Sequence, residues 1–163
     1  MIGALLRDLR QPEYIHVLLN PVPVYGLVVA LIGLIISLLL RSRAGQVVSL
    51  SLVLFSAAMA WPVYEFGEKS YDNVLTMSDD DGRAWLEAHE HRAERLIPCF
   101  YALAILSAIA IAVPLKFPKA AVPLVVATAV FGFVVLGVGA YIAQAGGKIR
   151  HREFRTVAPP KSD

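Results

Sequence analysis

The chain is poor in cysteine and in charge, and each shortage excludes a class of protein. Its 163 residues include a single cysteine, Cys99, which excludes an internal disulfide and any metal or iron–sulfur site built from several cysteines. Charged residues make up only 17% of the chain, and a formal net charge of +2 is too small to indicate a nucleic-acid-binding protein. Phosphate-loop, nucleophile-elbow and zinc-protease motifs are also missing, so nothing supports a hydrolase or a nucleotide-dependent enzyme.

Apolar residues are abundant instead, at 57% of the chain, against about 45–50% by a similar count in soluble domains. A bilayer core is spanned by about 20 helical residues. Four apolar runs approach or exceed this length, at residues 22–40, 47–66, 96–115 and 120–145. We therefore predict an all-α fold, an integral membrane four-helix up-down bundle. It would form a single domain over residues 1–157, followed by a disordered tail at 158–163.

A long polar segment, residues 61–95, separates the second run from the third. Within it, Ser78 and the three acids that follow predict a helix start, because serine is a good N-cap and acids suit the first turn of a helix. We expect this longer polar loop-helix to run directly into the third span. In the simplest interpretation, the acidic segment docks on the basic C-terminal tail. Glu65, at the membrane boundary, would then pair with Arg150 or Arg152.

The four histidines gather at one membrane edge if the apolar runs cross an even number of times. His16 precedes Val22 by six positions and His91 precedes Leu96 by five, so at about 1.5 Å per helical residue both lie roughly 8 Å beyond the apolar core. Two imidazoles at equal depth suit a bis-histidine haem b or a mononuclear transition metal. The candidate cofactor-binding residues are His16, His91, His89, Trp85 and Tyr64, and the candidate metal ligands are His16, His91, Glu65 and His151.

Several alternatives stay open for these histidines. His89 and His91 lie about 200° apart around a helix, so they cannot both face inward, and His89 is the alternate ligand. Glu87, four residues before His91, could orient that ring. Histidines at a membrane edge also serve as plain interfacial polar groups or as part of a solvated salt-bridge face. A di-iron centre is disfavoured, because we do not find the Glu-x-x-His pairs of such bundles.

The stretch His16-Val-Leu-Leu-Asn-Pro-Val-Pro-Val resembles the opening motif of a family of small bacterial four-helix integral membrane proteins of unknown function, roughly His-Pro-Leu-Leu-x-Pro-Phe-Pro-Ile. A histidine before the third helix and a Gly146-Gly147 pair with a polar exit after the fourth are also similar. The chain departs from the family at Val17, where proline is common, and Glu65-Phe66-Gly67 only approximates its acid motif. The resemblance covers about residues 14–154. It implies a redox setting outside the cytoplasm, because such domains are sometimes associated with c-type cytochrome domains.

Two indications of orientation conflict. Lysine and arginine are more numerous at the histidine edge than at the two tight turns, and the positive-inside rule would place that edge in the cytoplasm. The family resemblance implies the opposite. We follow the resemblance and predict a multi-pass protein of the bacterial inner membrane, with its termini and histidine edge in the periplasm.

Two functions are compatible with these features. The first is a redox or electron-transfer module that binds haem b or a metal at the histidine edge. The second is a non-catalytic accessory or structural subunit of a membrane complex, with the polar edge as a docking surface. A transporter or channel ranks last, because few ionisable groups lie within the spans. The expected partners are the lipid bilayer and a redox or other membrane-complex partner, not nucleic acid, and we do not expect an enzyme.

Overall fold

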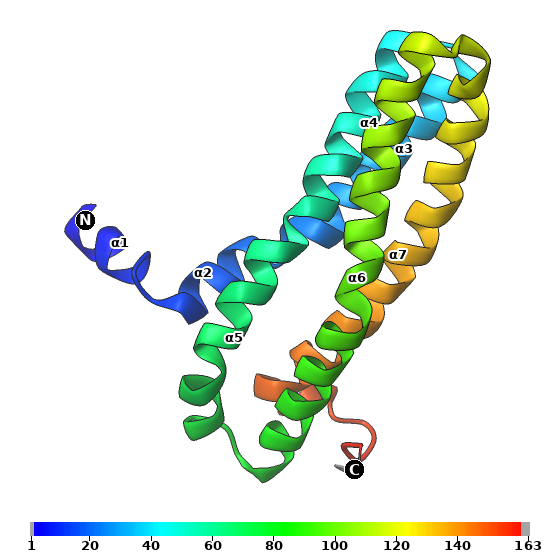
Figure 1. Cartoon of the computed structure of the whole chain (residues 1–163). Coiled ribbons are helices and arrows are strands. Elements are labelled where there is room, and N and C mark those ends of the chain that lie inside the picture. Colours follow the sequence, from blue (N-terminus) through cyan, green and yellow to red (C-terminus); the bar gives the residue numbers. More distant parts are fainter. Residues whose placement is uncertain (1, 161–163) are drawn as a thin grey trace.

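The computed structural model describes residues 2–160, and every regular element in that range is a helix (Figure 1). This confirms the predicted all-α class. Residues 158–160 belong to no helix, and the remainder of the tail predicted to be disordered, 161–163, lies outside the described residues. The elements are α1 (Ile2–Asp8), α2 (Pro12–Leu19), η1 (Val22–Gly26), α3 (Leu27–Leu39), α4 (Arg43–Ala58), α5 (Ala60–Thr76), α6 (Asp80–Lys116), η2 (Pro118–Ala120), α7 (Ala121–Arg150) and η3 (Arg152–Phe154).

Four helical stretches are long and apolar enough to cross a membrane, as expected of a multi-pass membrane protein. In Figure 1 the α3–α4 and α6–α7 turns lie at one end of the molecule, while the α5–α6 connection and the C-terminus lie at the other. Each stretch extends beyond its apolar run toward this second end. The stretches are Pro12–Leu39, Arg43–Thr76, Asp80–Lys116 and Pro118–Arg150.

Glycines let η1 and α3 approach α4 and α7 closely. A Cβ added at Gly26 would lie 2.6 Å from Ser56 Oγ, and one added at Gly33 would lie 2.9 Å from Ser49 Oγ. Gly26 faces Ser56, whereas Gly33, which comes later in the chain, faces the earlier Ser49. The two helical segments therefore run antiparallel. On α7, a Cβ at Gly132 would lie 2.7 Å from a methyl group of buried Leu31. Small residues at such contacts are what allow helices to pack within lipid.

Arg43 binds a carbonyl that a proline leaves without its helical donor. Pro114 lies inside α6 and has no N–H, so Ala110 O, four residues earlier, loses its usual partner. Arg43 Nη2 lies 3.2 Å from Ala110 O and 3.4 Å from Ile111 O. The guanidinium therefore ties the start of α4 to the end of α6, where positive charge is favoured by the helix dipole.

The boundaries of two helices differ from prediction. α6 is capped by Asp79, not Ser78: Asp79 Oδ1 accepts a 2.9 Å hydrogen bond from Gly82 N, while Ser78 Oγ donates to Val74 O at 2.7 Å. A carboxylate caps a helix as well as a hydroxyl does. The Ser78 hydroxyl is not free to cap α6, because it already donates to a carbonyl in the last turn of α5. α7 does not end at residue 145 but continues through its glycine pair to Arg150, because this last turn packs against α6.

The acidic segment does dock on the basic tail, as the simplest interpretation expected. Asp79 lies 2.9 Å from both Arg152 and Arg155, and the Arg155 side chain, only 9% exposed, also donates to Lys148 O at 2.8 Å. The hydrogen bond from Arg155, followed by that from the Gly82 amide, lowers the pKa of Asp79 from 3.8 to about 2. The pairing expected for Glu65 is corrected, because its carboxylate lies 3.6 Å from Lys69 Nζ, one turn away on the same helix.

Candidate functional site

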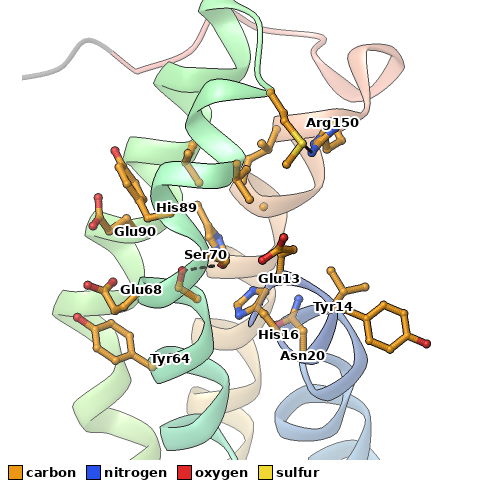
Figure 2. A pocket seen from close by; sticks show the side chains of 18 of the residues that line it. Glu13, Tyr14, His16, Asn20, Tyr64, Glu68, Ser70, His89, Glu90 and Arg150 are labelled. Atoms are coloured by element: carbon orange, nitrogen blue, oxygen red, sulfur yellow. Dashed lines mark hydrogen bonds between the residues drawn. The ribbon is translucent and has the colours of Figure 1, made fainter. Parts of the chain in front are cut away.

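The structure brings His16 and His89 together between the extended ends of the helices (Figure 2). Their ring centroids are 6.4 Å apart and their planes are inclined by 84°. His16 lies on α2 and His89 on α6, so residues 73 positions apart in sequence share one site. Both side chains are half-buried. Two imidazoles from different helices therefore meet, as the sequence predicted, although the partner of His16 is the alternate residue.

Both rings are fixed by the backbone of a neighbouring helix. His16 Nδ1 lies 2.8 Å from Val63 O on α5, and His89 Nδ1 lies 3.0 Å from Ile142 O on α7. A carbonyl oxygen only accepts, so each Nδ1 carries the hydrogen, and in a neutral imidazole Nε2 then presents a lone pair. Neither Nε2 has a hydrogen-bond partner among the described residues. Metal-binding histidines are oriented in this way by a bond from the second ring nitrogen.

Two cavities meet at this pair. The larger, of about 520 Å³, lies toward the polar edge, and the smaller, of about 260 Å³, lies between the apolar spans. His16, His89 and Tyr64 line both. The larger cavity also has several charged or polar walls, whereas the smaller is walled mainly by apolar side chains. The charged residues of the larger cavity are Glu13, Glu68, Glu90 and Arg150, and the apolar walls of the smaller include Pro23, Val24, Ile97, Phe100 and Ile142.

Glu13 is a site residue that the sequence reasoning missed. It lies on α2 one turn before His16 and lines the larger cavity, and its Oε2 atom is buried without a hydrogen-bond partner. The spacing Glu13-x-x-His16 was visible in the sequence, so a single Glu-x-x-His is present after all, although not the pair that a di-iron bundle requires. The two Nε2 atoms and the Glu13 carboxylate oxygen are all acceptors, but the three side chains do not form a cluster that could hold one metal ion. Of the three side chains, only the two histidine rings come together at one point.

His91 does not face His16, and this expectation is corrected. It is exposed and lines a separate surface hollow with Glu87 and Arg95, because a shift of two residues turns a side chain to the far side of α6. His151 lies on the exit from α7, where its Nδ1 is 2.9 Å from Glu153 Oε1. The expected metal set of His16, His91, Glu65 and His151 is therefore not brought together. Within residues 2–160, no cluster of three or more His, Cys, Asp or Glu side chains could hold a metal ion.

Of the two aromatic residues expected at the site, Tyr64 lines both cavities but Trp85 lines neither. Trp85 is 2% exposed and packs with Leu86 and Ile149 in a cluster between α6 and α7. Lys148 Nζ lies 4.1 Å from the centre of its ring, a cation–π contact. The tryptophan therefore helps to hold the two helices together and does not wall the site.

The fold and the site together define a class: an all-helical protein with four potential membrane spans and an internal histidine pair at one edge. Comparisons with protein-family models, with curated proteins and with solved structures found no match for this chain. Membership of the small four-helix family thus stays a prediction. The histidine pair is the feature from which a function has to be inferred.

Proposed function

We propose that this membrane protein is a redox module that binds haem b, which His16 and His89 would hold through their Nε2 atoms. The observation that carries the proposal is the separation of the two rings. When two imidazole nitrogens bind one metal at about 2.0–2.1 Å each, the ring centroids lie at most roughly 6.5 Å apart. The observed separation is 6.4 Å, and both rings are held through Nδ1.

The number of protein ligands favours haem over a bare ion. A structural or catalytic metal ion is normally held by three or four protein side chains. Haem iron needs at most two from the protein, because the porphyrin provides the other ligands. The described residues offer two histidines here and no cluster of three ligands. A transition metal completed by water is the second form of the same proposal, since it would use the same two nitrogens.

The walls of the cavities are also suited to an amphipathic cofactor. Apolar side chains such as Val24 and Phe100 surround the smaller cavity, and they would exclude water from the macrocycle. Arg150 is the sole arginine or lysine among the residues lining the larger cavity, and it could pair with the carboxylates of the cofactor. Haem iron supplies one-electron transfer when bound. The three glutamates of the larger cavity place negative charge nearby, which favours the oxidised state and predicts a low midpoint potential.

The wider setting of this module is part of the proposal. The protein would be an up-down bundle in the bacterial inner membrane, with the histidine pair at the periplasmic edge and a c-type cytochrome or another redox subunit as its electron partner. The resemblance of the His16–Val24 motif to the small four-helix family supports this setting. The position of the pair near the polar ends of the helices supports it as well, because a site there lies within short reach of a partner in water.

The test is an absorption spectrum of the full chain purified in detergent from haem-replete cells. We expect a reduced-minus-oxidised band of a low-spin haem b, near one haem per chain. His16→Ala and His89→Ala should each abolish that band or convert it to a high-spin form. His91→Ala and His151→Ala are matched controls and should leave it unchanged, because both residues are exposed and lie outside the two cavities.

Two results would contradict the proposal. Loss of the band in His91→Ala but not in His89→Ala would show that the wrong histidine has been assigned. Wild-type protein with neither a haem band nor stoichiometric metal by elemental analysis would end the redox interpretation, and the accessory-subunit alternative would then replace it.

A further inference from the structure

The two histidines are held by the same local arrangement, repeated. His16 bonds to the carbonyl of Val63, and Gly67 follows that residue by four positions. A Cβ added at Gly67 would lie 3.1 Å from both Cε1 and Nδ1 of the His16 ring. His89 bonds in the same way to the carbonyl of Ile142.

A glycine lies in the same position beside His89 as Gly67 does beside His16. Gly146 follows Ile142 by four positions, and a Cβ added there would lie 3.0 Å from Cε1 and 3.1 Å from Nδ1 of His89. In an α-helix, residues i and i+4 lie one above the other on the same face. A side chain at the glycine would therefore stand directly in the path of an imidazole that approaches the carbonyl, and its absence opens that path in both halves.

The equivalence extends through most of each span. When His16 is aligned with His89, four of the six buried positions of the first span fall on buried positions of the third: Leu27 on Phe100, Ala30 on Leu103, Leu34 on Ser107 and Ser37 on Ala110. The other two, Pro23 and Leu31, fall on the half-buried Leu96 and Ala104. When Val63 is aligned with Ile142, buried positions of the second span fall on those of the fourth: Gln46 on Val125, Ser49 on Thr128, Val53 on Gly132, Ser56 on Val135 and Ala60 on Gly139. The two alignments were not chosen to match the burial patterns. They are fixed by the two histidine–carbonyl hydrogen bonds, so the agreement in burial is an independent observation.

We infer that the chain consists of two structurally equivalent helical hairpins, Pro12–Thr76 and Asp80–Arg150, and that each supplies one half of the histidine site. Gly67 and Gly146 are the equivalent positioning residues of the two halves. Membrane proteins built from internal repeats place their sites at the interface between the repeats, and the pair of rings, one from each hairpin, lies at that interface here (Figure 2). The geometry of the half-sites stands without a cofactor, whereas their effect on a haem rests on the proposed function.

This equivalence has a physical consequence for the two glycines. At 3.0–3.1 Å, an added methyl group is too close to the ring by a few tenths of an ångström. The ring must move or turn by that amount, and the chain does not have to unfold. Each Gly→Ala change should therefore weaken one Nδ1–H bond and leave the other intact.

The experiment uses the full chain, labelled with ¹⁵N-histidine in detergent and prepared without haem, and reads the imidazole nitrogen resonances by NMR. Single His→Ala variants assign the four residues. In wild type, His16 and His89 should both show the Nδ1–H tautomer. Gly67→Ala should shift the resonances of His16 alone, and Gly146→Ala those of His89 alone. Gly137→Ala is the matched control, because a Cβ there meets nothing within 4 Å, and it should shift neither.

The inference is overturned if the two wild-type rings differ in tautomer, or if each glycine change perturbs both rings or neither. The tautomers of the wild-type rings test the inference even if a variant fails to fold. In haem-loaded protein, the two variants should shift the midpoint potential in the same direction and by a similar amount. A wild type that binds no haem but shows the paired tautomers would refute the proposed function and leave the two half-sites standing.

Discussion

Gly132→Ala is the substitution that most directly tests how α3 packs against α7. A Cβ at this position would lie 2.7 Å from Cδ2, 3.4 Å from Cδ1 and 3.5 Å from Cγ of Leu31. Carbon atoms in contact normally lie about 3.5–4.0 Å apart, so the nearest pair would overlap by roughly 1 Å. Leu31 is 1% exposed and cannot swing into lipid. Overpacking of this kind costs about 1–3 kcal/mol, and the better helix propensity of alanine offsets up to about 1 kcal/mol of it.

A second substitution, at Leu31, tests whether the loss of stability in Gly132→Ala comes from the contact between these two residues. Leu31→Val removes one methylene group and should cost about 0.5–1.5 kcal/mol by itself. In the double variant, the alanine methyl fills the space that the valine leaves. The combined loss of stability should therefore be smaller than the sum of the two single losses, by about 1 kcal/mol or more.

The assay is unfolding of detergent-solubilised protein by increasing SDS, followed by far-UV circular dichroism. Gly137→Ala is the control, because it lies on the same helix and its Cβ would meet no atom within 4 Å. Gly132→Ala should unfold at a lower SDS fraction than this control. Equal stability of the two variants, or strictly additive losses in the double variant, would refute the packing of Leu31 against α7.

Two more predictions concern the polar edge. Because the hydrogen bond from Arg155 lowers the folded-state pKa of Asp79 from 3.8 to about 2, the contribution of this contact to stability is complete above pH 3.8 and is lost as the pH falls through 2. The hydrogen-exchange protection factors of residues 148–155, relative to the intrinsic rate at each pH, should fall in that acid range. At neutral pH they should fall in Asp79→Asn but not in the control Asp80→Asn; equal protection in both variants would contradict the contact. Alkaline phosphatase fused after Asp163 should be active if the histidine edge is periplasmic, whereas fluorescence from a green fluorescent protein fusion would show that the count of basic residues is the better guide.

Much of the architecture could be predicted from local features of the sequence. Long apolar runs indicate helices that cross a membrane, because backbone polar groups in lipid must be satisfied within one segment. Ser78 and the acidic residues before Trp85 predict the helix that enters the third apolar run. The depth of His16 relative to the apolar core predicts that it is one half of a paired site. The exact helix ends were harder: Gly146 and Gly147 are typical of a helix end, yet the close contact of His89 with Gly146 holds this turn in the helix.

Local sequence patterns are therefore enough to predict four helical spans, their places in the chain and a gathering of histidines at one edge. They do not predict that His89, and not His91, meets His16. That choice depends on the rotation of α6 about its axis, which is set by Trp85 and by the fit of the His89 ring over Gly146. Composition and periodicity describe each helix alone, whereas rotation and register arise from the contacts between helices, and these contacts form the site.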